Sequence, residues 1–320
     1  MRQRLNPTKP KLNAPGWAAP TLASLHRHSE ADWQRIFATQ PDAAVAWIQL
    51  SARSGFKAAQ LVLGQMHLDG QGVARDSALA YGWFMKAAAL GSIEARNMVG
   101  RCHELGWGVP VDQAEALCHY RKAAAAGLAW GHYNAGCLLL YGTGLRRDHQ
   151  QALSHFLAAA SQEHAKAMGL LGRCHEEGWG VPVDQAAAAT WYARAAEGGD
   201  CWGAFNLGLM QAETGASRDA AIWMERAVAA ATPNCLAVIV KTLVSHSDPK
   251  LRQIALMASD LLLPESLKTA YAVPVLDRLT VHASVRSRKS LGSLHSAAAA
   301  VFGLALLLLA HVLPMNRRAG

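Results

Sequence analysis

Two copies of one short segment carry the residues of this chain that are best suited to chemistry. The letters RCHELGWGVPVDQA occupy residues 101–114 and RCHEEGWGVPVDQA occupies 173–186, so thirteen of fourteen letters recur 72 residues later. Cysteine, histidine and carboxylate side chains are the ligands that zinc prefers, and a low-pKa cysteine can also sense oxidants. The duplicated Cys-His-Glu trio therefore raises the hypothesis of a metal or redox site.

Both segments lie inside a longer repeat of 36 residues. One column of this repeat is always glycine, at Gly64, Gly100, Gly136, Gly172 and Gly208. Gly-x-Gly pairs and a following aspartate keep the same step, which is the signature of a repeat array. Each unit has room for two helices, predicted in the first full unit at about residues 59–68 and 76–90, with the aspartate as N-cap of the second helix. Asp112 followed by Glu115 has the form of a capping box.

The repeated letters Ala-x-x-x-Leu-Gly, Gly-x-Gly-Val, Asp, Ala, Trp and Ala-Ala resemble the Sel1-like repeat, a relative of the tetratricopeptide repeat with a longer loop between its helices. LGQMHLDGQGV, NAGCLLLYGTGL and NLGLM carry the match, which covers about residues 43–231. The resemblance implies an all-α protein, a right-handed α-solenoid of about five 36-residue helix-turn-helix repeats. It also implies a concave face that binds other proteins in adaptor or assembly roles, without a shared enzymatic activity.

The repeat register favours a packing role for the trio. Cys102 and Cys174 share a column that other repeats fill with apolar residues: Met66, Leu138 and Met210. The histidine column is mixed, and a zinc site needs ligands that converge, whereas repeats two apart in a solenoid do not touch. We therefore predict no metal and no cofactor, and keep a Cys/His metal or redox sensor as the alternative function.

Partner-binding residues are sought in columns whose chemistry varies. Trp130 and Trp202 share a column near the start of the first helix with Glu94 and Lys166, and this variety predicts a surface position. Exposed tryptophans are good anchors for a partner peptide or helix. The opposing interpretation, that they pack against the preceding repeat, stays open.

Four further residues complete the predicted partner site. Asn134 and Asn206 share a first-helix column, and in the related tetratricopeptide fold asparagines on that wall can clamp a peptide backbone. Arg101 and Arg173 follow the repeat glycine and could pair with carboxylates or remain solvated. Trp107 and Trp179, inside the Gly-x-Gly turns, are predicted to fold back as lids over the helix pair.

Charge and motifs exclude several function classes. The net charge is +8, but ten cations lie before residue 30 and after residue 285, so residues 30–285 carry 8 − 10 = −2. A nucleic-acid reader should carry its basic residues on the ordered body, so no specific nucleic acid is expected as partner. The chain has no P-loop, no G-x-S-x-G elbow and no H-E-x-x-H, so we predict a non-enzymatic protein without a small-molecule substrate.

The predicted organisation has four parts. Residues 1–28 form a basic tail that contains prolines, 29–233 the solenoid, 234–285 a helical cap and extension, and 290–315 a C-terminal apolar helix. Residues 297–313, AAAAVFGLALLLLAHVL, would span ~26 Å as a helix, slightly less than a hydrocarbon core of ~30 Å. Three interpretations stay open. The protein could be cytoplasmic and anchored to the inner membrane through residues 291–315, it could be a subunit of a membrane complex, or this helix could be buried against a partner.

Overall fold

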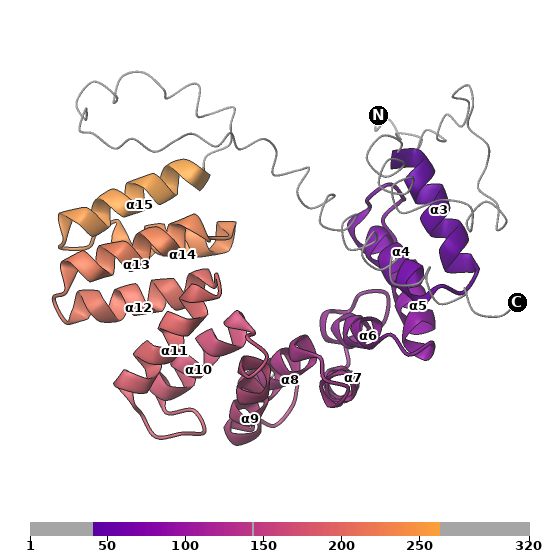
Figure 1. The fold of residues 1–320 in the computed structure, drawn as a ribbon, viewed down its shortest axis with the longest axis horizontal. Coiled ribbons are helices and arrows are strands. Elements are labelled where there is room, and N and C mark those ends of the chain that lie inside the picture. The colour runs from indigo at the N-terminus through magenta and orange to yellow at the C-terminus, as the bar shows by residue number, and fades with distance from the viewer. Residues whose placement is uncertain (1–40, 143, 263–320) are drawn as a thin grey trace, which may run out of the picture. The chain divides into compact units, whose positions relative to one another are not determined.

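The structure is a computed structural model that describes residues 41–142 and 144–262, and within these residues it contains helices and no strand (Figure 1). The thirteen described helices are α3 Pro41–Arg53, α4 Lys57–Asp69, α5 Ser77–Ala89, α6 Ile93–Leu105, α7 Gln113–Ala125, α8 Ala129–Tyr141, α9 His149–Ala160, α10 Ala165–Glu177, α11 Gln185–Glu197, α12 Cys201–Glu213, α13 Ser217–Ala229, α14 Pro233–Leu243 and α15 Pro249–Leu262. The all-α prediction is confirmed, and so are the helices predicted at residues 59–68 and 76–90.

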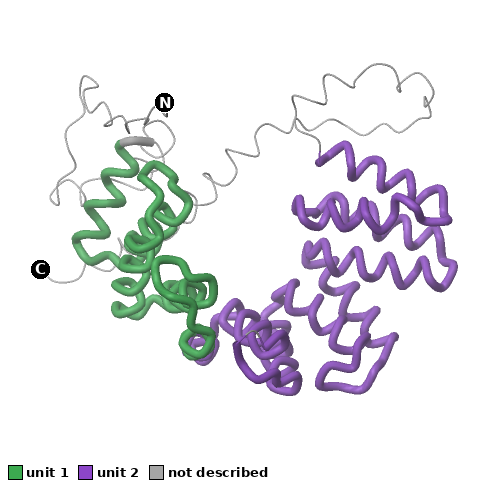
Figure 2. The backbone as a smooth tube through the Cα atoms, turned by 180° about the vertical axis from the view of Figure 1, so that it is seen from behind, with its two compact units in different colours: residues 1–119, 289–320 green, residues 120–288 purple. Residues whose placement is uncertain are grey.

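Consecutive helices pack as antiparallel hairpins, and the hairpins stack as an α-solenoid. α4 packs on α5, α8 on α9, α10 on α11, α12 on α13 and α14 on α15. The chain divides into two compact units, the first ending at His119 and the second beginning at Tyr120, and each is described by itself (Figure 2).

The Gly-x-Gly segment ends one helix and starts the next in the manner the sequence predicts. Gly106 and Gly178 have φ of 72° and 74°, a left-handed conformation that glycine adopts at low cost, and they cap α6 and α10. Six residues later, the carboxylates of Asp112 and Asp184 each accept a 2.9 Å hydrogen bond from a backbone N–H of the following helix. The predicted aspartate N-caps are confirmed.

Only half of the predicted capping box is present. The backbone N–H of Asp112 donates to the carbonyl of His103 at 2.9 Å, so it is not free for the Glu115 side chain. Glu115 instead lies 3.2 Å from His119, one turn further along α7. The reciprocal bond is lost because the backbone of the preceding helix already uses this donor.

The glycine column lets a large ring reach the first helix of each hairpin. A Cβ at Gly172 would lie 2.5 Å from Cδ1 of Tyr192, a separation that atoms cannot keep without displacement. The same relation joins Gly64 to Phe84 and Gly136 to Phe156. The paired-alanine column is buried as well, with Ala87, Ala123, Ala159 and Ala195 fully inaccessible to solvent. Close helix approach thus explains why these columns tolerate no bulk.

The hairpin α12–α13 and the helices after it close the second unit. The loop between α12 and α13 has three residues, 214–216, where α10 and α11 are joined by seven, 178–184, so this last repeat has a loop shorter by four residues. Beyond Pro233, where the sequence register is lost, Leu236 and Ile239 of α14 pack into one core with Met224 of α13. α14 therefore covers the apolar face of α13, as predicted.

Two predictions fall on residues 1–40 and 263–320, which lie outside the described residues, as residue 143 does: the basic tail and the apolar helix at 290–315. No described helix combines the length and the apolar character needed to span a membrane.

Candidate partner-binding surface

The two cysteines of the duplicated segment are packing residues. Cys102 and Cys174 are fully buried, and burial raises the pKa of their thiols to about 12 and about 11, because a thiolate loses its hydration there. A buried thiol that keeps its proton is a poor nucleophile and a poor metal ligand. Within the described residues, no three His, Cys, Asp or Glu side chains come together as a metal site would require.

The glutamate of the second trio serves a buried tyrosine. The hydroxyl of Tyr192 donates a 2.6 Å hydrogen bond to Glu176 Oε2, and the side chain of Asn206 hydrogen-bonds the same hydroxyl. The pKa of Tyr192 is raised, first by burial and then by the Glu176 carboxylate, so the hydroxyl stays a donor. The amide of Asn206, predicted as a peptide clamp, thus has one partner inside the protein; Asn134 is half-buried in the equivalent place on α8.

Trp130 is both packed and exposed. It lies on the first turn of α8 with 46% of its surface open to solvent. Tyr133 and His164 meet its ring edge to face, with ring centroids 5.6 and 4.5 Å away, and the ammonium of Lys166 lies 5.4 Å from its centroid. These neighbours fix the indole, because aromatic edge-to-face pairs and cation–π contacts are each favourable. Trp130 is therefore exposed, as the first interpretation predicts, and these ring contacts lie on α8 and at the start of α10, not on the preceding repeat.

Trp202 takes the same position two repeats later. It lies on the first turn of α12, is 38% exposed, and meets Phe205 edge to face with centroids 6.2 Å apart. Lys166, at the corresponding position of α10, is exposed. Successive first helices of the second unit thus expose an indole, an ammonium and an indole at one register position. Sequence reasoning missed Tyr133 and His164, which support this surface. Their positions could have indicated this role, since Tyr133 lies one turn after Trp130 and His164 directly precedes α10.

The arginines of the predicted site stack on loop tryptophans. The guanidinium of Arg101 lies 4.9 Å from the ring centroid of Trp107, and that of Arg173 lies 5.1 Å from Trp179. Trp107 also packs against the apolar core formed around Phe84, which confirms its predicted role as a lid. Among the residues that the structure describes, a cation–π contact and not an ion pair holds these arginines.

Glu94 is exposed at the start of α6 and accepts a 3.0 Å hydrogen bond from Ser92. It belongs to the first unit together with Arg101, whereas the other predicted site residues belong to the second. The structure brings Trp130 and Lys166 into contact with each other, and Asn206 into contact with Tyr192. It does not join all eight predicted residues into one site.

A histidine pair lies between α8 and α9. Nδ1 of His132 and Nδ1 of His155 are 3.1 Å apart, beside a hollow of ≈220 Å³ that Gln151 and Ser154 also line. The pKa of His155 is lowered to about 4, first by burial and then by the charges of His132 and Arg121. Burial also lowers the pKa of His132, so both rings are neutral near pH 7, and an N–H of one imidazole can donate to the unprotonated nitrogen of the other.

Comparison with known proteins matches the repeats. The Sel1 repeat model matches residues 57–92, 93–128, 131–164 and 165–200. A Sel1 repeat protein from Oxalobacter formigenes is 23% identical with a TM-score of 0.62, over 73% of this chain and 100% of that one. The protective antigen c5321 of uropathogenic Escherichia coli, which displays an SLR fold, is 23% identical with a TM-score of 0.54, over 72% of this chain and 53% of the antigen. At these identities the structures show the fold alone. No curated protein matches the sequence.

Proposed function

Because four Sel1 repeats make this chain a Sel1-like repeat protein, we propose that it is a non-enzymatic scaffold that binds a protein partner through Trp130, Lys166 and Trp202. The observation that carries this proposal is the exposure of these three side chains at one register position of α8, α10 and α12. Large apolar side chains that stay open to water commonly mark binding surfaces. The prediction that this surface is the concave one stays a prediction.

The chemistry of the three side chains limits the partner. Two indoles favour apolar or aromatic side chains, which they bury at low entropic cost. The ammonium between them favours a carboxylate, which would replace water without leaving a buried unpaired charge. A partner segment that presents an acidic residue between two apolar ones fits this surface.

The indole of Trp130 is already held in place before a partner arrives. Its contacts to Tyr133 and His164 restrict its rotamer, so binding loses less side-chain entropy than it would at a mobile tryptophan. The buried Asp200 caps α12 directly before Trp202: its carboxylate accepts a 3.0 Å hydrogen bond from Gly203. Both anchors therefore stand on ordered helix starts.

Affinity purification with quantitative mass spectrometry tests the proposal. The full chain, the double variant W130A/W202A and the single variant K166E are compared with a control, L157A/V183A, which removes exposed apolar side chains elsewhere in the second unit. We expect partners to be depleted at least about tenfold by the first two and retained by the control, since hot-spot truncations cost ~2 kcal/mol or more.

Thermal denaturation of each variant shows whether the fold is kept. If W130A/W202A is folded and recovers the same proteins in the same amounts as the unmodified chain, the proposed surface is wrong. Depletion by L157A/V183A to the same degree would point to a general loss of solubility and would also contradict it.

A further inference from the structure

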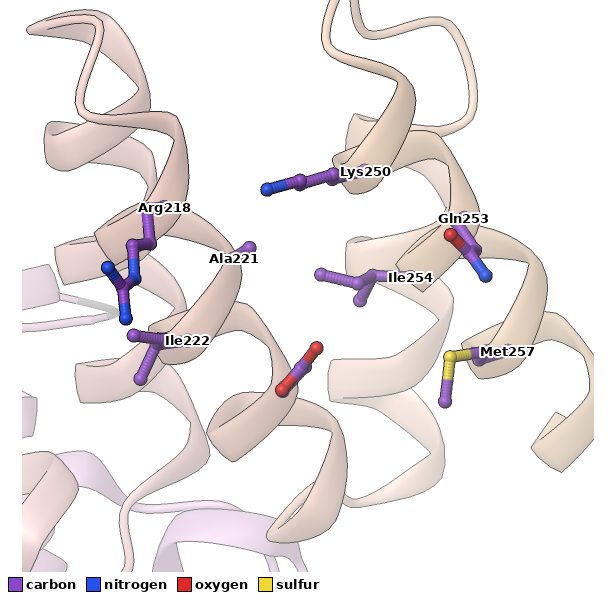
Figure 3. Close-up of a pocket in the computed structure, with 8 residues that line it drawn as sticks. Arg218, Ala221, Ile222, Lys250, Gln253, Ile254 and Met257 are labelled. Atoms are coloured by element: carbon purple, nitrogen blue, oxygen red, sulfur yellow. The ribbon is translucent and has the colours of Figure 1, made fainter. Parts of the chain in front are cut away.

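A second candidate docking surface lies at the far end of the second unit, between α13 and α15. A cavity of ≈470 Å³ is lined there by eight residues: Arg218, Ala221, Ile222, Glu225, Lys250, Gln253, Ile254 and Met257 (Figure 3). Ile222 is 42% exposed and Met257 is 54% exposed. The floor is thus apolar and open to water, a combination that folded proteins usually keep for contacts.

The connection between α14 and α15 differs from the loops of the full repeats. In the full repeats, the Gly-x-Gly loop of one hairpin lies against the first turn of the second helix of the preceding hairpin. A Cβ at Gly180 would lie 2.5 Å from the carbonyl oxygen of His149, and the ring of Trp179 lies 6.0 Å from the imidazole of His149. The connection between α14 and α15, residues 244–248, has five residues and neither glycine nor tryptophan. The first turn of α13 therefore has no loop indole from this connection against it, whereas Trp179 lies against the first turn of α9.

The two ends of the groove carry opposite charges. Arg218 and Lys250 are the second residues of α13 and α15, and Figure 3 shows Lys250 reaching into the space between the two helices. Neither cation forms an ion pair with a described carboxylate that lines the groove; Asp248, which caps α15, is bonded to the backbone N–H of Lys250 and to Ser217. Glu225 lies seven residues after Arg218, about 10 Å further along the groove.

Cations at the start of a helix are unfavourable for that helix, because they face the positive end of its dipole. Arg218 and Lys250 both occupy such positions, so an external carboxylate near them would relieve this repulsion in two helices at once. The groove is therefore complementary to a ligand that is acidic at one end and apolar along its length.

We propose that the groove between α13 and α15 binds a short amphipathic helix of a protein partner, with its acidic N-terminal end beside Arg218 and Lys250. Bulky apolar side chains on one face of that helix cover Ile222, Ile254 and Met257, as the loop tryptophan covers the equivalent turn in earlier repeats. Carboxylates belong in the first turn of such a helix, where its own dipole favours them. This surface is separate from the one at Trp130 and Trp202, so either can be correct without the other.

A displayed peptide library tests the proposal with the full chain as bait. The peptides have about four helical turns, tryptophan or leucine along one face, and acidic, basic or neutral residues allowed at both ends. Enriched peptides are then measured by fluorescence anisotropy against M257D and R218E/K250E. The matched controls are L256D, an equally exposed apolar residue of α15 outside the groove, and K241E, an exposed cation of α14.

We expect enrichment of peptides with acidic N-terminal ends, at least about tenfold weaker binding by M257D and R218E/K250E, and unchanged binding by L256D and K241E. The proposal is overturned if no peptide is enriched, if the enriched peptides show no charge bias, or if M257D and L256D weaken binding equally. Sedimentation velocity adds one more refuting outcome: self-association of the full chain that M257D abolishes would make a second copy the occupant.

Discussion

Replacing Tyr192 with phenylalanine tests whether the glutamate of the duplicated segment has a structural task. The substitution removes the donor of the 2.6 Å hydrogen bond to Glu176 and the partner of the Asn206 amide, while the ring against Gly172 stays. Hydrogen bonds to charged groups contribute about 1.5–3 kcal/mol. Because Glu176 is half-buried and can regain some water, we expect the lower part of that range, about 1.5–2 kcal/mol.

The chain supplies its own apolar replacement for this network. The neighbouring repeat has Leu140, Phe156 and Leu170 in the columns of Glu176, Tyr192 and Asn206. The triple variant E176L/Y192F/N206L should therefore recover most of the loss, since it leaves no polar group without a partner. The reverse single variant, F156Y, places a hydroxyl among leucines and should cost about 1–3 kcal/mol.

Urea denaturation followed by tryptophan fluorescence measures these differences in the free energy of unfolding. In a repeat array the effect can be confined to neighbouring repeats, so hydrogen exchange of α10–α12 is measured beside it. A loss below about 0.5 kcal/mol in Y192F, or a triple variant that is no more stable than Y192F, would refute this account of the glutamate.

Two further predictions concern a buried histidine and the glycine column. Because burial holds the pKa of His155 at about 4, below the ~6.5 of an unfolded chain, stability is complete above pH 6.5 and falls as the pH drops from 6.5 to 4. The loss of stability is at most about 3 kcal/mol, and it is smaller than this limit because the ring keeps some contact with solvent. The variant H155W introduces the tryptophan that other repeats have at this position, so its denaturation midpoint should depend less on pH. G172A should cost about 1–3 kcal/mol through its clash with Tyr192, whereas G82A, which meets open space in α5, should gain about 0.5–1 kcal/mol; equal thermal midpoints for the two would contradict the packing argument.

Sequence reasoning reached the helices because their signals are local. The αL glycines Gly106 and Gly178 and the capping aspartates each act within one hairpin, so the residue types alone predict their structural role. The shorter loop at residues 214–216 is also visible in the sequence, because Trp223 follows Trp191 by 32 residues and not by 36. The capping box at Glu115 failed because its donor is taken by His103, a residue of another helix that no local pattern includes.

The site was harder to predict because exposure depends on neighbours from other repeats. Column variety identified Trp130 and Lys166 as surface residues, but it could not show that Tyr133 and His164 hold the indole. Arg173 was expected to seek carboxylates or water, and its partner is the ring of Trp179. A cation–π contact has no fixed sequence spacing across a loop, so only the folded turn discloses it.

The duplication that first suggested chemistry has a physical basis in the alternation of two kinds of hairpin. Glu176, Tyr192 and Asn206 recur 72 residues earlier as Glu104, Tyr120 and Asn134, while the repeats before and between these two sets carry leucine, phenylalanine and an apolar residue in the same columns. A buried tyrosine hydroxyl needs polar companions, so these three residues are expected to change together. The recurring columns are then committed to packing. The proposed function assigns partner recognition to columns that packing leaves free to vary, such as the one shared by Trp130, Lys166 and Trp202.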